Sequence, residues 1–140
     1  MKKYEIGLYE KAMRNTLTWK EKLQCAKECG YDYLEISIDA TEEKINRIYM
    51  DTEEKREIME AIFDTGIPIG SMSVSALTKY ALGDPDQAVR DRGMEIAEKS
   101  IQLSSALGVR TVMIPGYDIY YGESTIETKR YFLENIRKIA

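Results

Sequence analysis

The sequence predicts an α/β fold in which four βα units build one parallel sheet. Strand-like segments begin near residues 4, 33, 69 and 110, and a segment with helical periodicity follows each of them. Every main helical segment begins at a capping signal, and three of them end at a glycine. Strict alternation implies parallel strands joined by right-handed crossovers. No linker divides the chain, so residues 1–140 are expected to form a single domain.

The first unit is predicted from an alternating segment and a capping box. Residues 4–9 alternate around apolar positions and predict a strand. Thr18 and Glu21 have the spacing of a capping box that opens a helix, and Gly30 stands where a C′ residue ends it. The apolar stripe of this helix consists of Trp19, Leu23 and Ala26.

The second unit repeats this arrangement. Residues 33–38 predict a strand with Leu34, Ile36 and Ile38 on one side and Tyr33, Glu35 and Ser37 on the other. A short helical connection follows, and the segment Asp51-Thr52-Glu53-Glu54 predicts a second capping box. The expected apolar stripe of the helix, which Gly66 ends, consists of Ile58, Met59, Ile62 and Phe63.

The third unit combines a strand with a long helix. Residues 69–74 predict the strand. Asp84 is the expected N-cap, with Pro85 at the first helical position and Gln87 at N3, and the helix continues to Gly108. Gly93 inside this helix indicates a close approach to a neighbouring segment.

The fourth unit consists of a strand over residues 110–114 and a helix opened by the expected capping box Ser124-Thr125-Ile126-Glu127. Phe132, Ile136 and Ile139 share one face of that helix. Nothing after Ala140 caps the helix, so the chain is expected to be a fragment of a longer fold.

The composition is typical of a globular protein without nucleic-acid or membrane partners. Of the 140 residues, 44% are hydrophobic and 31% are charged, and the formal net charge is −4. A negative chain has no general attraction to phosphate backbones, so no nucleic acid is expected as a partner. No run approaches the ~18 apolar residues of a membrane span, so we expect no membrane partner and a cytoplasmic location.

The cysteine and histidine content restricts the chemistry. Cys25 and Cys29 lie four residues apart in a helical pattern and are expected to be reduced packing residues, because a redox or metal pair needs further ligands. The chain contains no histidine, which excludes a Ser/His or Cys/His nucleophile within it.

One face of the predicted sheet is polar, which decides between two parallel folds. A doubly wound sheet is covered on both faces and has apolar strands, and no G-x-G-x-x-G fingerprint follows the first strand. A polar face is expected to line a lumen, so we predict the (β/α)8 TIM-barrel type with four βα units, a half barrel. The residues of the polar face are Gly7, Tyr9, Glu35, Ser37, Ser71, Ser73 and Ser75.

Three segments resemble one enzyme family. They are Gly7-Leu8-Tyr9-Glu10-Lys11-Ala12-Met13, the stretch from Ala26 to Asp39, and Gly116-Tyr117-Asp118-Ile119-Tyr120-Tyr121. Together they resemble the L-ribulose-5-phosphate (L-xylulose-5-phosphate) 3-epimerases, also described as hexulose-6-phosphate isomerases, of the xylose-isomerase-like TIM-barrel superfamily. The resemblance spans the whole chain and implies a role in carbohydrate metabolism, including ascorbate utilisation.

The resemblance also implies where the chemistry lies. Family barrels are about twice as long, with a divalent metal held by Glu, Asp, His and Glu from strands five to eight, and two of these glutamates exchange the C3 proton of the substrate. This chain matches the first half only, so we expect no catalytic residue, no metal ligand and no cofactor in it. The family's Ser-Gly/Ala-His-Arg run corresponds here to Ser75-Ala76-Leu77-Thr78-Lys79-Tyr80, which lacks the histidine and the arginine.

Six residues are candidates for substrate binding. Glu10 and Lys11 follow the first strand at the end where barrel enzymes place their sites, with a solvated ion pair as the alternative. Glu35 is the best lumen carboxylate, or a hydrogen-bonded residue that orients its neighbours. Tyr117 and Tyr121 could form an aromatic wall or simply pack over the rim, and Ser75 is the serine most able to reach a ligand.

Two functions remain open at this stage. The chain is either half of a pentulose-5-phosphate epimerase, inactive alone and bound to sugar phosphate once the barrel is completed, or a half-barrel assembly module. The module would pair as a homodimer or with a complementing C-terminal half, which would cover its open strand edges. A poorly stable fragment without activity is the third alternative.

Overall fold

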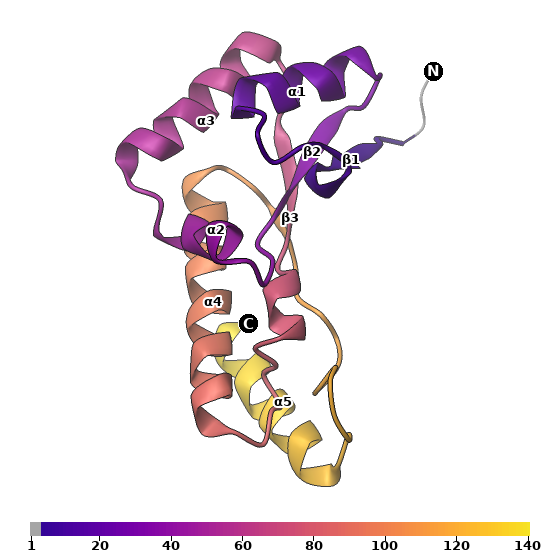
Figure 1. The fold of residues 1–140 in the computed structure, drawn as a ribbon, viewed down its shortest axis with the longest axis vertical. Coiled ribbons are helices and arrows are strands. Elements are labelled where there is room, and N and C mark those ends of the chain that lie inside the picture. The colour runs from indigo at the N-terminus through magenta and orange to yellow at the C-terminus, as the bar shows by residue number, and fades with distance from the viewer. Residues whose placement is uncertain (1–3) are drawn as a thin grey trace.

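The computed structural model describes residues 4–140 and contains one parallel sheet of four strands in the order β1-β2-β3-β4 (Figure 1). The strands are Gly7–Tyr9 (β1), Tyr33–Ser37 (β2), Ile69–Ser73 (β3) and Thr111–Met113 (β4). Each pairs with its neighbour in sequence, which confirms the prediction of four consecutive βα units.

The two edge strands are shorter than expected. The predicted strand over residues 4–9 is reduced to Gly7–Tyr9, and the one over residues 110–114 to Thr111–Met113. β1 pairs only with β2, and β4 pairs only with β3, so each of them has hydrogen-bonding partners along one side. The two central strands match the prediction to within one residue.

Over residues 4–140, five α-helices connect the strands and follow them. They are Trp19–Glu28 (α1), Glu42–Ile45 (α2), Thr52–Thr65 (α3), Gln87–Ala106 (α4) and Ile126–Ile139 (α5). Both capping boxes expected in the first two units are present, at Thr18 with Glu21 and at Asp51 with Glu54. The three helix-ending glycines have φ values of 78°, 74° and 70°, the left-handed conformation that glycine adopts most readily.

Two helix starts differ from the prediction. Asp86, not Asp84, is the N-cap of α4, because the Asp84 carboxylate accepts a bond from the Asp86 amide at 2.8 Å and shapes the preceding turn. The capping box of α5 pairs Thr125 with Thr128, not Ser124 with Glu127, because the Ser124 hydroxyl donates to Asp118 at 2.8 Å.

The predicted apolar stripe of α3 was partly wrong. Ile58 is fully buried, but Met59 is 45% exposed and Phe63 is 89% exposed. Each residue turns the helix by about 100°, so Met59 and Phe63 point away from the face that Ile58 shares with Ala61 and Thr65. The small Ala61 and the polar Thr65 complete the buried face, which hydrophobicity alone does not reveal.

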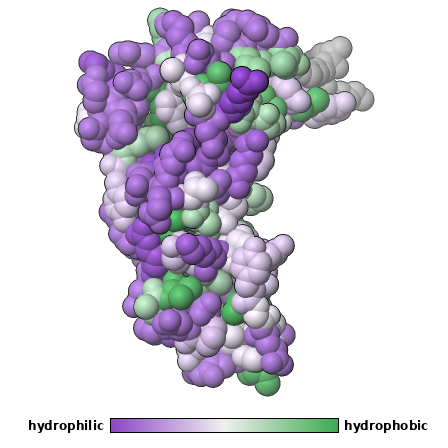
Figure 2. Space-filling view, viewed as in Figure 1, coloured by the Kyte–Doolittle hydropathy of each residue, from purple (hydrophilic) through white to green (hydrophobic). Residues whose placement is uncertain are grey.

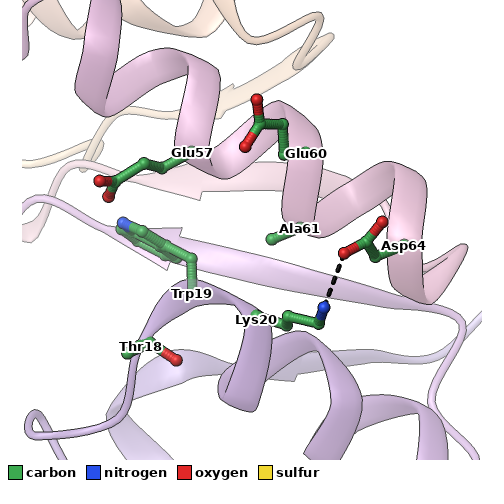
Figure 3. A pocket seen from close by; sticks show the side chains of 7 residues that line it. All are labelled: Thr18, Trp19, Lys20, Glu57, Glu60, Ala61 and Asp64. Atoms are coloured by element: carbon green, nitrogen blue, oxygen red, sulfur yellow. Dashed lines mark hydrogen bonds and ion pairs between the residues drawn. The ribbon is translucent and has the colours of Figure 1, made fainter.

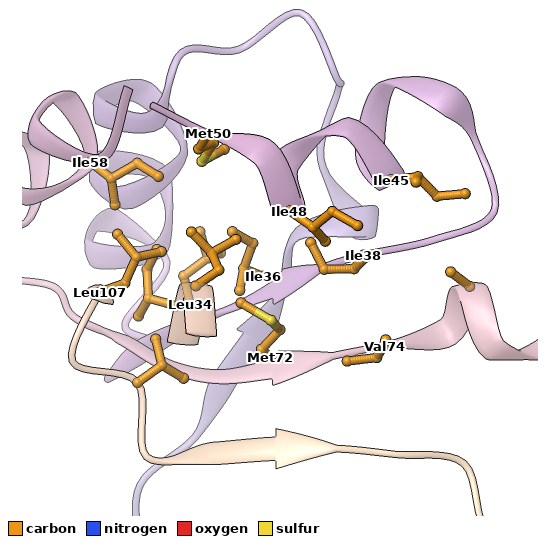
Figure 4. Close-up of a cluster of buried hydrophobic side chains, with 14 of the residues drawn as sticks. Leu34, Ile36, Ile38, Ile45, Ile48, Met50, Ile58, Met72, Val74 and Leu107 are labelled. Carbon is orange, nitrogen blue, oxygen red and sulfur yellow. The ribbon is translucent and has the colours of Figure 1, made fainter. Parts of the chain in front are cut away.

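The hydrophobic core lies between the sheet and the helices (Figure 4). Leu34, Ile36 and Met72 project from the central strands into this layer and are fully buried. Their neighbours along the strands, such as Ser37 and Ser73, face the opposite side. The alternation predicted from the sequence is therefore present, with one apolar and one polar face of the sheet.

The outer surface is mainly hydrophilic in the view of Figure 2, and its hydrophobic side chains occur in small separate groups. Among residues 4–140, no helix is both long enough and apolar enough to cross a membrane.

Gly93 provides a test of helix packing. A Cβ atom at this position would lie 2.3 Å from the carbonyl oxygen of Tyr80, so the close approach expected from the sequence is present. We expect Gly93→Ala to lower the free energy of unfolding by about 1–3 kcal/mol, in spite of the higher helix propensity of alanine.

Urea unfolding of the two proteins measures this difference. Gly116→Ala is the matched control, because nothing lies within 4 Å of a Cβ atom there, and we expect it to change the free energy of unfolding by less than about 0.5 kcal/mol. Equal stabilities of the two variants would contradict the packing argument.

Candidate functional site

The polar face of the sheet carries its side chains in two levels. At the lower level, Tyr9, Glu35 and Ser71 are paired across β1, β2 and β3. At the upper level, toward the carboxyl ends of the strands, Ser37 is paired with Ser73. Carboxyl ends of parallel strands are where barrel enzymes place their sites, so the upper level is the candidate site.

Hydroxyl groups and one ammonium group meet at this end of the sheet. The hydroxyls of Tyr9 and Ser37 lie 3.1 Å apart. Lys11 Nζ donates to Ser75 Oγ at 3.3 Å and lies 3.1 Å from Asp39 Oδ2. We call Tyr9, Lys11, Ser37, Asp39 and Ser75 the mouth cluster. It brings together two predicted site residues, Lys11 and Ser75, although they are 64 positions apart in the chain.

The electrostatics of the mouth cluster favour its charged forms. Burial raises the pKa of Tyr9, whereas hydrogen bonds with Ser37, Ser73 and Ser75 and the charge of Lys11 lower it. The lowering effects outweigh burial, so the net shift of this pKa is downward. Burial lowers the pKa of Lys11, and Asp39 and Tyr9 more than offset this, so the net shift is upward.

Asp39 is a member of the site that the sequence reasoning missed. Burial raises the pKa of its carboxyl, whereas hydrogen bonds from Thr41 and the charge of Lys11 lower it below the usual value. Thr41 donates to Asp39 Oδ1 from its amide at 2.9 Å and from its hydroxyl at 2.7 Å. Its position directly after the second strand, at the same end of the sheet as Lys11, could have identified Asp39 as a site residue.

Glu10 lies outside the mouth cluster, in a buried group of charges on the helix side. The side chain is fully enclosed, with Lys44 Nζ 3.4 Å from Oε1, Lys22 Nζ 3.6 Å from Oε2, and the guanidinium of Arg47 in an ion pair with Oε1. The amide of Ser37 also donates to Oε1, at 3.2 Å. We call Glu10 and its three cations the Glu10 cluster, and its geometry favours a structural role over ligand contact.

Trp19 supports two of these cations. Lys22 Nζ and the guanidinium carbon of Arg47 each lie 4.9 Å from the centroid of its ring. An aromatic face attracts cations, most strongly where water is excluded. The tryptophan predicted as part of an apolar stripe therefore also stabilises the buried positive charge.

Glu35 and the tyrosines occupy other parts of the polar side. Glu35 accepts a bond from Ser71 at 2.6 Å and borders a hollow of about 480 Å³ that also reaches Asp32 and Thr111, toward the amino ends of the strands. The hydroxyls of Tyr117 and Thr78 lie 2.7 Å apart, which ties the loop after β4 to the loop after β3. Tyr121 is exposed, and its ring packs against Tyr120.

A separate pocket of about 420 Å³ lies between α1 and α3 (Figure 3). Its floor includes Trp19 and Ala61, and Lys20 crosses it to Asp64 at 2.7 Å. None of the six predicted site residues lines it, so it is distinct from the candidate site.

The donor groups of this part of the chain do not fit a divalent metal. Within residues 4–140, no group of three or more His, Cys, Asp or Glu side chains is placed to hold one. Glu35 and Asp39 are already held, Glu35 by Ser71 and Asp39 by Lys11 and Thr41. No chemical step is therefore assigned to a metal in this chain.

Four parallel βα units with a polar inner face define half of a TIM barrel. Residues 23–140 match the family model described as xylose isomerase-like TIM barrel, and the chain belongs to this family.

Two curated relatives are similar over nearly the whole chain. A protein named putative L-ribulose-5-phosphate 3-epimerase SgbU, from Haemophilus influenzae, is 41% identical over 136 residues, which cover 97% of this chain and 48% of the relative. The L-ribulose-5-phosphate 3-epimerase UlaE of Escherichia coli is 39% identical over 98% of this chain and 48% of its own length. The chain thus spans about half the length of the curated relatives it matches.

Solved structures agree on the fold. A D-psicose 3-epimerase in the presence of D-fructose matches with a TM-score of 0.74 at 17% identity, over 98% of this chain and 47% of that one. A xylose isomerase-like TIM barrel protein from Mycobacterium smegmatis in complex with magnesium matches with a TM-score of 0.67 at 13% identity, over 98% of this chain and 50% of that one. Both confirm the half-barrel prediction.

Glu10 offers a test of the buried charges. Glu10→Gln removes the one carboxylate that faces three cations, and an uncompensated buried charge is costly. We expect the free energy of unfolding to fall by about 3–5 kcal/mol at neutral pH. Urea unfolding followed by the fluorescence of Trp19, the only tryptophan, measures it.

Glu60→Gln is the control, because its ion pair with Arg56 is exposed to solvent. We expect this substitution to change the free energy of unfolding by less than about 1 kcal/mol. A Glu10→Gln protein as stable as the control would show that the Glu10 cluster does not hold the fold together.

Proposed function

We propose that this chain forms the first four βα units of a 3-epimerase barrel that acts on L-ribulose 5-phosphate or L-xylulose 5-phosphate. The observation that carries the proposal is the 39–41% identity, over nearly the whole chain, to relatives named L-ribulose-5-phosphate 3-epimerase UlaE and putative L-ribulose-5-phosphate 3-epimerase SgbU. The mouth cluster at the carboxyl ends of the strands supports it, since this is the end at which barrel enzymes bind substrates.

The residues of this chain would bind and orient the substrate. Lys11 and Ser75 provide donors at the mouth, and Tyr117 forms part of its rim. Epimerisation beside a carbonyl needs a base, an acid on the opposite face and a group that stabilises the enediolate. Within residues 4–140 no group of three or more His, Cys, Asp or Glu side chains is placed to hold a metal, so we propose that these groups, and a divalent metal, belong to the other half of the barrel.

The proposal predicts no activity for the chain alone. With magnesium or manganese added, we expect no exchange of the C3 proton of L-ribulose 5-phosphate in D2O by NMR. Addition of a separately produced second half of the Escherichia coli relative is expected to restore exchange, because it completes the barrel.

The second half alone is the control and is expected to be inactive. Exchange catalysed by this chain without a partner would contradict the proposal, and so would a correctly folded single-chain fusion of the two halves that lacks exchange.

The alternative is a half-barrel assembly module that pairs as a homodimer or with a complementing C-terminal half. The open side of β4 favours it, because an apolar hollow of about 220 Å³ lies there between α4 and α5. At the other edge of the sheet, Ile6 is 42% exposed. A strand added beside β4 would cover the hollow and pair its backbone. The apolar residues of the hollow are Ile101, Val112, Ile114, Ile136, Ile139 and Ala140.

Sedimentation velocity tests the module. We expect association that strengthens with concentration and that Val112→Lys weakens at least tenfold, because a charge would enter the hollow. Phe63→Lys, on the exposed face of α3, is the control and should leave association unchanged. A folded protein that stays monomeric at millimolar concentration would count against pairing with itself.

A further inference from the structure

The two cysteines of the chain lie one helical turn apart at the end of α1. Cys25 belongs to the helix and Cys29 is its C-cap residue, and the Cys29 amide donates to the Cys25 carbonyl at 3.0 Å. Both thiols are free, and Cys29 is exposed, so the packing role expected from the sequence does not hold for it. Cys25 borders a hollow of about 410 Å³ that is open to solvent, so an ion from solution can reach both sulfurs.

The two thiols face each other on one side of the helix. Residues four apart in a helix have Cβ atoms about 5–6 Å apart. Burial raises the pKa of the Cys25 thiol, and the charge of Cys29, the hydrogen bond between the two thiols and the charge of Glu28 raise it further. Because thiolates, not thiols, attack disulfides, Cys25 is a poor nucleophile for disulfide exchange at neutral pH.

The spacing of this pair suits a bridging ion better than a disulfide. A disulfide brings its Cβ atoms to about 3.5–4.5 Å, which is closer than a regular helical turn places them. A metal–thiolate bond is about 2.3 Å long, so one ion can join two sulfurs that lie up to about 4.6 Å apart. An ion between Cys25 and Cys29 therefore leaves the last turn of α1 intact.

The number and the kind of donors select the ion. Thiolates are soft ligands that favour Cu(I). A structural zinc ion requires four ligands, and over residues 4–140 no group of three or more His, Cys, Asp or Glu side chains is placed to hold a metal. Cu(I) forms stable complexes with only two thiolates, so it needs no further ligand from the chain.

We propose that Cys25 and Cys29 form a two-coordinate site for Cu(I) on α1. Each S–H bond breaks as a sulfur–copper bond forms, so two protons pass to solvent, and copper stays Cu(I) because no electron is transferred. No member of the mouth cluster or of the Glu10 cluster lines the hollow, whose residues are Lys20, Glu21, Gln24, Cys25 and Glu28. Copper binding at this site is therefore independent of the proposed epimerase function.

Anaerobic titration of the chain with Cu(I) tests the site, with bicinchoninate as the coloured competitor. We expect one Cu(I) per chain and a new ultraviolet absorption band from thiolate-to-copper charge transfer. Cys25→Ser and Cys29→Ser should each weaken Cu(I) binding at least hundredfold, because a single thiolate remains in each variant.

A double variant, Gln24→Cys with Cys25→Ser, is the matched control. It keeps two thiols, but they are five residues apart and lie about 140° from each other around the helix. Gln24 is exposed, and its printed bond goes to Glu28 on the helix surface, so the exchange disturbs no buried contact. We expect this control to bind Cu(I) as weakly as the single variants.

Three results would overturn the site: no bound copper, single variants that bind as tightly as the wild-type protein, or a control that does so. X-ray absorption of the copper-loaded wild-type chain gives a test that needs no variant. Two sulfur ligands per copper in a monomeric complex support the proposal, whereas three or more, or one ion shared between two chains, contradict it.

Discussion

The alternation of apolar and polar side chains along parallel strands is the constraint on which the rest of this structure depends. Because neighbouring residues of a strand face opposite sides, Leu34 and Ile36 enter the helix layer while Glu35 and Ser37 face the other side. The helices are held by the first face. The second face carries hydroxyl and charged side chains, and those of Ser37 and Ser73 lie toward the carboxyl ends of the strands.

Local chemistry explains which features of the fold could be predicted from the sequence. The capping box at Thr18 and the left-handed glycines depend on residues within one turn of the helix, and both were predicted correctly. The start of α4 was missed because Asp84 and Asp86 both provide a carboxylate and only the path of the turn selects between them. Phe63 was misplaced because the buried face of its helix is completed by an alanine and a threonine, whose burial depends on packing partners.

The candidate site shows the same division between local and distant information. Lys11 was predicted as a site residue from its position after the first strand and Ser75 as the serine most able to reach a ligand, and the structure brings the two within 3.3 Å. The burial of Glu10 was not predictable, because its three cations come from positions 12 to 37 residues further along the chain and show no periodicity with it. In the sequence, Glu10 and Lys11 look like one ion pair. In the structure Glu10 is buried among its three cations and Lys11 belongs to the mouth cluster, and ion pairs through Lys44 and Asp39 connect the two.

The loop after β3 contributes packing, not charge, at the two positions that correspond to the family's histidine and arginine. In the family that the sequence resembles, this loop carries a histidine and an arginine, and here Leu77 and Thr78 occupy the corresponding stretch. Leu77 is buried in the core, and the Thr78 hydroxyl lies 2.7 Å from that of Tyr117, so both contribute to packing of the loops and neither adds charge. Behind the sheet, the buried cations Lys22, Lys44 and Arg47 are paired with Glu10, and Trp19 packs against two of them. Buried ion pairs are screened less by salt than exposed ones, so the Glu10 cluster is expected to keep its contribution to the fold at high ionic strength.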